Sequence, residues 1–297
     1  MKDRSSDMLE LTILAPAHNE QDNIEPLVAE IEAVLFRMNM IPDPAQARDH
    51  NTSSPPDFSG EFILVDDGST DETRALALKL SATRPWMRVL SMTNTPPGKG
   101  NGQSAAFYAG IRAARGRLIA LLDADLQNDP ADYPDMLALL RDKQADMVQG
   151  DRSHDRRDTL VRRLSSLVGR LFRRLLLGDT IRDTGCSLRM MKREIGLALP
   201  LEFKGMHRFI PLTARQLGYT VIEMPVHHRP RHAGEAKYGI WNRAIPGLVD
   251  CFAVRWMRNR RRPVTSSELT RAELTGTPAD IPAGQNQENG QAAEIKA

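Results

Sequence analysis

The sequence predicts an α/β protein in which a mostly parallel, Rossmann-like sheet carries helices on both faces, with an amphipathic helix near the C-terminus. Two observations lead to this fold class. Short apolar runs alternate with segments of helical periodicity through the first half of the chain, which is typical of parallel strands joined by crossover helices. Polar residues gather directly after those apolar runs, and open parallel sheets bind ligands beyond the carboxyl ends of their strands.

Each element follows from its own stretch of sequence. The apolar runs are expected to be strands buried on both faces, and they cover residues 10–16, 61–67, 87–92, 116–125 and 145–151. Helical spacing predicts helices over residues 23–38, 71–82, 103–114 and 131–143. An irregular loop is expected over residues 41–60, because this stretch has four prolines and no periodicity.

Length and composition limit the class of protein. The 297 residues are 41% hydrophobic, which is enough for one substantial core. Forty basic and thirty-eight acidic side chains give a net charge of +2, which argues against a protein built to coat nucleic acid. The arginines are unevenly spread, because residues 152–174 hold eight arginines and two aspartates, whereas residues 255–262 hold five arginines and no acid.

Targeting signals and cysteines indicate the compartment. The first ten residues are charged and lack an apolar core, so we expect no secretory signal. No window approaches the ~20 apolar residues that a membrane-spanning helix needs. The two cysteines, Cys186 and Cys251, are too few for a disulfide framework, which favours a reducing compartment. The chain is therefore expected to be soluble or peripheral to a membrane.

Two carboxylates, Asp123 and Asp125, stand one residue apart where the apolar run 116–125 ends. Oxygen ligands are what Mg²⁺ and Mn²⁺ prefer, and such ions commonly bridge a protein carboxylate to a diphosphate. A strand end that only caps the next helix would show the same short pattern. The metal interpretation is favoured because the first two predicted strands also end in polar clusters, at residues 16–20 and 66–73.

The second polar cluster and a glycine-rich loop suggest contacts to a nucleotide. A turn and a helix cap explain much of residues 66–73. They do not explain the adjacent Asp66 and Asp67, and an acidic residue at the end of an early strand is well placed to accept hydrogen bonds from ribose hydroxyls or a base edge. In the stretch 96–103, glycines could let backbone amides and Lys99 approach a phosphate.

Four motifs, LAPAHNEQDNI, ILVDDGSTDET, GKGNGQSAAFYAGIRAARG and IALLDADLQNDP, occur in this order. Together they resemble the catalytic domain of family 2 glycosyltransferases of GT-A fold, and the nearest branch is the dolichyl- and polyprenyl-phosphate sugar synthases. The resemblance covers about residues 9–258. It implies an inverting transferase with a UDP- or GDP-linked sugar donor and a Mg or Mn ion held by Asp123, Asp125 and Gln127. The implied nucleotide-sugar contacts are Pro16, Ala17, Asn19, Glu20, Asp66, Asp67, Lys99, Gly100, Gln103 and Ala124.

Motifs further along the chain resemble the acceptor side of the same branch. They are GDR at 150–152, DTGCSLRMMKRE at 183–194 and HRFIPLTARQLGYTVIEMPVHHRPRHAGEAKYG at 207–239. They imply phosphate contacts by Arg152, Arg189 and Arg231, with Lys237 on a loop that closes over the donor. Asp183 is the candidate base if the acceptor is a hydroxyl. Residues 185–189 only approximate the usual Gly-Phe-Arg run, and Ala236 replaces the serine usual before the lysine.

Two basic segments carry apolar stripes at helical spacing. The stripe of residues 161–178 comprises Leu164, Leu167, Val168, Leu171, Phe172 and Leu175, and that of residues 241–262 comprises Trp241, Ile245, Leu248, Val249, Phe252 and Trp256. Such helices lie in a membrane interface, where each nearby Lys or Arg contributes ~1 kcal/mol of binding to anionic lipid. Each stripe could instead pack on the domain. The tryptophans favour the membrane for the second segment, and the first leaves both interpretations open.

These observations divide the chain into a catalytic domain over 1–238, an interfacial helix over 239–262 and a disordered polar tail over 263–297. The expected function is transfer of a sugar from a nucleotide sugar to a polyprenyl phosphate, by a peripheral enzyme at the cytoplasmic face of the plasma membrane. One alternative is transfer to a saccharide hydroxyl in cell-wall or lipopolysaccharide synthesis. A nucleic-acid-binding protein is a further alternative, which the charge balance and the lack of aromatics among the arginines disfavour.

Overall fold

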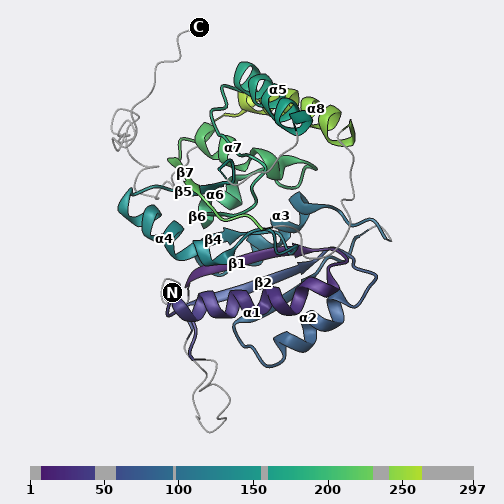
Figure 1. The fold of residues 1–297 in the computed structure, drawn as a ribbon, viewed down its shortest axis with the longest axis vertical. Helices are drawn as coiled ribbons and strands as arrows, with labels where there is room; N and C mark the ends of the chain where they lie inside the picture. Colours follow the sequence, from purple (N-terminus) through teal and green to yellow (C-terminus); the bar gives the residue numbers. More distant parts are fainter. Residues whose placement is uncertain (1–7, 44–57, 96–97, 155–159, 230–240, 263–297) are drawn as a thin grey trace, which may run out of the picture. The chain divides into compact units, whose positions relative to one another are not determined.

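The computed structural model describes residues 8–43, 58–95, 98–154, 160–229 and 241–262, and for 160–168 and 241–245 it describes the helical backbone only. Its centre is a seven-stranded sheet in the order β3-β2-β1-β4-β6-β5-β7 (Figure 1). The strands are β1 (Leu9–Ala17), β2 (Gly60–Asp66), β3 (Met87–Ser91), β4 (Gly116–Leu121), β5 (Met147–Asp151), β6 (Arg189–Lys192) and β7 (Val221–Pro225). All neighbours are parallel except β6, which is antiparallel to β4 and β5. The predicted mostly parallel α/β sheet is confirmed.

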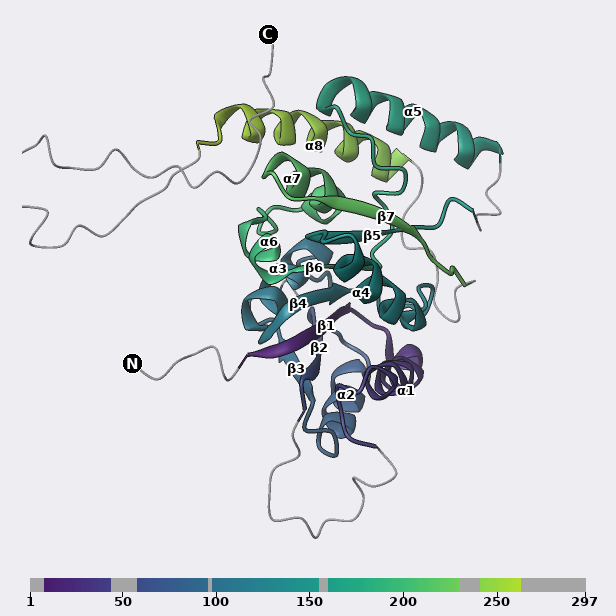
Figure 2. The ribbon, with the colours of Figure 1, turned by 90° about the vertical axis from the view of Figure 1, so that its left-hand side faces the viewer.

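Helices cover both faces of the sheet. In Figure 2, α1, α2 and α4 lie on one side of the strands and α3 and α6 on the other. The helices are α1 (Gln21–Arg37), α2 (Thr73–Ser81), α3 (Gln103–Ala113), α4 (Tyr133–Asp142), α5 (Leu160–Leu177), α6 (Arg193–Ala198), α7 (Ile210–Gln216) and α8 (Trp241–Arg260), with 3-10 turns η1 (Pro130–Asp132) and η2 (Met206–Phe209). Gly110 lets α3 approach β1 closely, because a Cβ there would lie 2.2 Å from Leu14 Cδ1.

The strands form because their side chains are apolar and enclosed on both faces. Every residue of β2 is buried, and so are the residues of β1 from Leu11 to Ala15. Glu61, near the start of β2, accepts a hydrogen bond from Thr12 Oγ1 (2.8 Å) and pairs with Arg88 (3.0 Å). Its charge is therefore compensated within the sheet.

The second half of the sheet differs from the sequence prediction. The strand expected over residues 116–125 ends at Leu121, so Asp123 and Asp125 lie in the turn that follows it. Neither β6 nor β7 was expected as a strand. β6 is only four residues long and pairs with β4 and β5, which precede it by dozens of residues, so no local pattern specifies its place.

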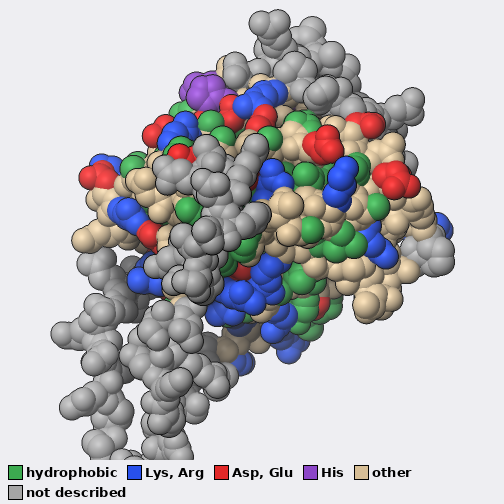
Figure 3. Space-filling view, turned by 90° about the horizontal axis from the view of Figure 1, so that it is seen from below, with side chains coloured by type: hydrophobic (Ala, Val, Ile, Leu, Met, Phe, Trp, Pro, Cys, Tyr) green, Lys and Arg blue, Asp and Glu red, His purple; other side chains and the backbone are tan. Residues whose placement is uncertain are grey.

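Helices α5 and α8 pack against each other. The rings of Phe172 and Phe252 meet edge to face with centroids 6.0 Å apart, and Arg255 Nη1 donates to the Leu176 carbonyl at 2.8 Å. Figure 2 shows α5 and the start of α8 beyond the β7 edge of the sheet. Seen from below, the molecule presents interspersed acidic, basic and apolar side chains (Figure 3).

The chain divides into two compact units, and the boundary follows Arg255, inside α8. The division proposed from the sequence, at 238/239 and 262/263, stays a prediction, and residues 263–297 lie outside the described part. Pro246 is accommodated within α8, which continues on both sides of it. Among the described residues, no helix combines the length and the apolarity that crossing a bilayer requires.

Candidate active site

The loops that follow β1 and β2 are joined by hydrogen bonds between side chains and backbone. Asn19, which has a left-handed backbone (φ 56°), accepts the Thr70 N–H on Oδ1 at 2.8 Å and donates its own N–H to Ser69 Oγ at 3.0 Å. The Glu20 N–H donates to Thr73 Oγ1 at 2.8 Å. The polar clusters predicted after the first two strands thus form one surface.

Asp66 is the buried carboxylate that supports this surface. It ends β2 opposite Ala17 of β1 and is completely buried. Its Oδ1 accepts the Ser69 N–H at 3.0 Å, and its Oδ2 pairs with Arg74 Nε at 2.6 Å. Both carboxylate oxygens have protein partners, so Asp66 shapes the turn in addition to any ligand contact. Arg74 was not singled out in the sequence analysis, although it lies eight residues after Asp66.

Asp67 holds the glycine-rich loop. Its carboxylate accepts the N–H of Asn101 at 2.8 Å and of Gly102 at 2.6 Å. Gly100 has φ +63° and passes so close that a Cβ there would lie 2.7 Å from Asp67 Oδ2. Lys99 is exposed on the same loop. The loop is therefore attached to the end of β2, with its lysine facing solvent.

The loop leads directly to the aspartate pair. Gln103, the first residue of α3, donates from Nε2 to Asp123 Oδ1. Asp123 is partly buried, and Ala124 between the two aspartates is buried. Burial, reinforced by repulsion from Asp125, raises the pKa of Asp123 to about 6, against the opposing effects of a Ser187 hydrogen bond and nearby arginines. The turn therefore concentrates negative charge that the protein only partly compensates.

The residues present fit a divalent cation. Two partly buried carboxylates, one residue apart, supply the oxygen ligands that Mg²⁺ and Mn²⁺ prefer, and their mutual repulsion is one cause of the raised pKa of Asp123. Gln127 follows in the same turn, and its N–H donates to Asp125 Oδ1 at 3.2 Å. The described residues contain no cluster of three His, Cys, Asp or Glu side chains suited to a metal. An ion held here would take its remaining ligands from water or from a diphosphate.

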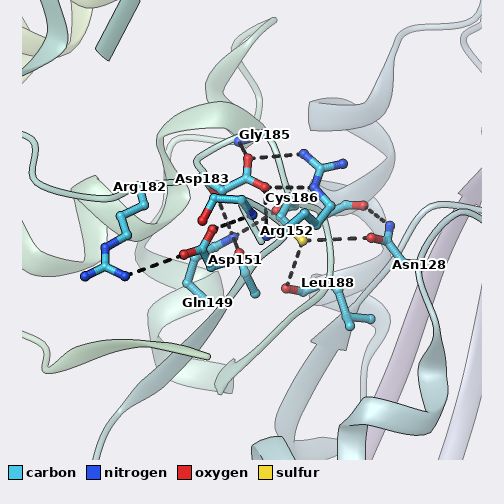
Figure 4. A network of polar contacts seen from close by, with 12 residues as sticks. Asn128, Gln149, Asp151, Arg152, Arg182, Asp183, Gly185, Cys186 and Leu188 are labelled. Carbon is cyan, nitrogen blue, oxygen red and sulfur yellow. Dashed lines mark hydrogen bonds and ion pairs between the residues drawn. The ribbon is translucent and has the colours of Figure 1, made fainter. Parts of the chain in front are cut away.

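Figure 4 shows the buried ion pair on the other side of the site, between Arg152 and Asp183. Arg152 donates from Nε to Asp183 Oδ2 at 2.8 Å and from Nη2 to Oδ1 at 3.1 Å, and the Gly185 N–H also donates to Oδ1 at 3.1 Å. Burial alone would lower the pKa of Arg152, but Asp183 raises it above its usual value. The pair stays ionised, and each member reduces the other's availability to a ligand.

Arg189 is the second buried cation. Its side chain is 2% exposed, and it donates to the backbone carbonyls of His207, at 3.1 Å, and of Cys186. Its Nε has no hydrogen-bond partner in the described part of the chain. Burial lowers the pKa of Arg189 to about 10, so it remains charged at neutral pH. Its charge favours the ionised form of Asp123.

Three polar residues that the sequence analysis did not identify support this half of the site (Figure 4). Gln149 is fully buried and donates from Nε2 to the carbonyls of Gly150, Asp183 and Cys186. Asn128 donates from Nδ2 to Ser187 Oγ at 2.8 Å. Gln149 carries the one available sequence signal, because it is a polar residue inside a predicted buried strand.

The segment after β7 returns to the aspartate turn. The Arg229 backbone N–H donates to the Gln127 carbonyl at 2.8 Å, and Asn128 forms a β-bridge with His228. His227 Nδ1 lies 2.7 Å from Asp132 Oδ1. Two predicted site residues, Arg231 and Lys237, come next in the chain but lie outside the described residues.

The family model for glycosyl transferase family 2 matches residues 12–196. The chain belongs to glycosyltransferase family 2. It is 34% identical to a dodecaprenyl-phosphate galacturonate synthase of Rhizobium johnstonii, over 86% of this chain and 69% of that protein. It is 33% identical to an undecaprenyl-phosphate 4-deoxy-4-formamido-L-arabinose transferase of an Enterobacter species, over 84% of this chain and 69% of that protein. Membership of this family makes the chain a glycosyltransferase enzyme.

Solved structures support the GT-A-like fold of this family 2 member. A Pyrobaculum calidifontis mannosyltransferase in complex with GDP-mannose and Mn²⁺ superposes with a TM-score of 0.54 at 19% identity, over 86% of this chain and 66% of the other. A Mycobacterium tuberculosis glucosyl-3-phosphoglycerate synthase with Mn²⁺, UDP-glucose and phosphoglyceric acid gives a TM-score of 0.57 at 18% identity, over 82% of this chain and 80% of the other. Identities this low show the fold alone.

Proposed function

We propose that this enzyme transfers a sugar from a UDP- or GDP-linked donor to a polyprenyl phosphate at the cytoplasmic face of the plasma membrane, with inversion at the anomeric carbon. The single observation that carries the proposal is the likeness, over most of the chain, to relatives named for transfer to undecaprenyl or dodecaprenyl phosphate. The site supports it with an aspartate pair beside the buried Arg189 and the partly buried Arg152.

The donor half of the site has the groups that a nucleotide diphosphate requires. Asp123 and Asp125 would hold a Mg or Mn ion, which as a Lewis acid stabilises the negative charge of the departing diphosphate. Gln103 orients Asp123 through its amide. The loop held by Asp67 presents its glycine backbone and Lys99 near the same rim, which suits phosphate binding.

The acceptor half has to neutralise an anion. A lipid phosphate is already negatively charged near neutral pH, so its oxygen can attack without a strong base. Arg189 and Arg152 supply positive charge beside Asp123, and their charges lower the pKa of that aspartate. We infer that they, together with Arg231 and Lys237, orient the acceptor phosphate and the donor diphosphate.

Transfer to a saccharide hydroxyl would instead require a base, and Asp183 is the candidate. Both of its carboxylate oxygens accept hydrogen bonds from Arg152. A carboxylate neutralised in this way is a weak proton acceptor. This geometry favours the lipid phosphate as acceptor.

The surface of α5 and α8 suits a lipid membrane. Large apolar side chains are exposed on both helices: Leu171, Leu175, Leu248, Val249 and Phe252. Arg170, Arg174 and Arg255 are exposed on the same helices. Asp250 is the only acidic residue in either helix, and it faces Arg208 at 3.7 Å. An apolar surface with adjacent arginines and almost no acid matches an anionic membrane interface.

A substrate panel tests the proposal. Purified protein with Mn²⁺ should be given UDP- and GDP-sugars together with a short polyprenyl phosphate, the matching polyprenol, or a saccharide. We expect a sugar-phospholipid only from the phosphate. Asp183→Asn should keep a substantial fraction of that activity. Transfer to the saccharide that disappears in Asp183→Asn would establish the alternative acceptor class instead.

A further inference from the structure

The short turn η2 contacts both halves of the candidate site. On the acceptor side, the His207 carbonyl accepts a hydrogen bond from Arg189 Nη1 at 3.1 Å. On the donor side, the His207 N–H donates to Ser104 Oγ at 3.0 Å, and His207 Nδ1 lies 2.8 Å from the same oxygen. One residue therefore bonds both to the first turn of α3 and to the buried cation of β6.

The hydroxyl of Ser104 makes two contacts to His207. Ser104 is 3% exposed, and its hydroxyl has a single proton. Its Oγ accepts the His207 N–H and also meets Nδ1 of the same residue, so the backbone and the ring of His207 are both joined to one buried side chain.

Both contacts of His207 lead to the surroundings of Asp123. Ser104 follows Gln103, the residue whose amide donates to Asp123 Oδ1. Arg189 pairs across the sheet with Leu121, two residues before Asp123. A displacement of η2 would therefore change the amide donor and the cation near this carboxylate together.

We propose that His207 is a positioning residue. It fixes the position of Gln103 through Ser104, and that of Arg189 through the His207 backbone carbonyl, so that both stay placed around Asp123. The inference rests on the proposed function only in that Asp123 takes part in holding a metal-bound nucleotide. His207 acts through its neighbours. Its side chain contributes the Ser104 contact, and its backbone contributes the contact to Arg189.

Calorimetric titration of the full chain with Mn²⁺–UDP and Mn²⁺–GDP tests this role without an acceptor. Ser104→Ala and His207→Ala should each weaken binding of the preferred nucleotide about tenfold. The double variant should be no weaker than Ser104→Ala alone, because the ring contact that His207→Ala removes is already lost in Ser104→Ala. His207→Asn, whose amide oxygen can accept the Ser104 proton, should recover part of the loss. Arg215→Ala is the matched control. It removes hydrogen bonds to Thr180 Oγ1 (2.7 Å) and the Val221 carbonyl (3.0 Å), and it should leave binding unchanged.

A metal-free measurement gives a second readout. Nitrogen NMR should show a different chemical shift for His207 Nδ1 in Ser104→Ala than in the wild type, because the contact between Nδ1 and Ser104 Oγ is lost. Additive losses in the double variant, a lower melting temperature with unchanged nucleotide affinity, or a wild type that binds no Mn²⁺–nucleotide would each overturn the inference. If the variants follow the expected pattern but the wild type transfers no sugar to a lipid phosphate, the inference is supported and the proposed function alone is contradicted.

Discussion

The donor and acceptor halves of the site are built in different ways. The donor half consists of loops at the carboxyl ends of β1, β2 and β4, connected to one another by short bonds between side chains and backbone. The acceptor half consists of a buried ion pair and a buried arginine, next to the antiparallel strand β6. The donor half therefore depends on local turns, whereas the acceptor half depends on pairing between distant parts of the chain.

This difference predicts how each half responds to substitution. A half-exposed carboxylate in a turn does little for packing, so its loss should abolish chemistry and leave the fold intact. A buried arginine that donates hydrogen bonds to backbone carbonyls supports both the chemistry and the fold, so its loss should reduce activity and stability together.

The largest effect is expected for Asp125→Asn in the donor half. The rate of transfer should fall about 100-fold or more, because several kcal/mol of stabilisation depend on the ion that Asp125 helps to hold. The melting temperature should change little, since Asp125 is half-exposed. Initial rates at saturating Mn²⁺ and a thermal melt measure both quantities.

A matched control for that variant is Asp135→Asn, which removes an exposed carboxylate from α4. It should retain full activity. Full turnover of Asp125→Asn in excess chelator would contradict the metal role assigned to the donor half.

The next largest effect is expected for Arg189 in the acceptor half. Arg189→Ala should lower the rate by roughly tenfold or more and lower the free energy of unfolding by about 2 kcal/mol, because the His207 carbonyl loses its Arg189 donor and the Cys186 carbonyl keeps only the one from Gln149. Arg189→Lys should rescue poorly, since an ammonium lacks the planar fork that reaches both carbonyls. Rates and denaturant titrations of the two variants test this.

Arg84→Lys is the control for Arg189→Lys. It makes the same conservative change in a more accessible ion pair, in which Arg84 Nε lies 3.1 Å from Glu32 Oε1. It should leave both measurements close to wild type. A fully active, fully stable Arg189→Ala would mean that the acceptor half does not depend on this residue.

The same difference explains what the sequence could predict. The first five strands and helices α1 to α4 were placed within a few residues, because each is a local apolar or amphipathic pattern. Asp123 and Gln103 were named as site residues from motifs, and the structure places them in contact. The contact of Arg189 with His207, and the pairing of Arg152 with Asp183, join residues that no local pattern relates. Burial of Arg189 depends on β6, and this strand is too short to be predicted from a sequence pattern.

A smaller effect is expected at the apolar surface of α5 and α8. Leu175, the most exposed of its large apolar side chains at 76%, should insert into the lipid interface. Leu175→Ser should weaken binding to anionic liposomes about fivefold, at low and at high salt, because the apolar contribution is not screened. Leu78→Ser removes a similarly exposed leucine (53%) from α2 and should have no effect. Equal sedimentation of both variants with liposomes would rule out this surface as the membrane contact.

The smallest effect concerns pH and sharpens the account of the donor half. Because the pKa of Asp123 is raised from 3.8 to about 6 in the folded protein, ionising it opposes folding, and the metal-free protein should lose stability as pH rises through 4 to 6. Mn²⁺ relieves that penalty. The Mn²⁺-induced rise in melting temperature should therefore be small at pH 5 and larger, by a few degrees, at pH 7.5. An equal rise at both pH values would show that Asp123 is not a ligand.

The central claim is that the acceptor is a lipid phosphate, and the most direct measurement is mass spectrometry of the product. Purified enzyme, Mn²⁺, a panel of UDP- and GDP-sugars and a short polyprenyl phosphate should yield one new lipid whose mass equals the acceptor plus one sugar, linked through the phosphate. The same incubation with the polyprenol should yield none. A product formed on the polyprenol or on a saccharide, with the polyprenyl phosphate unchanged, would contradict the account.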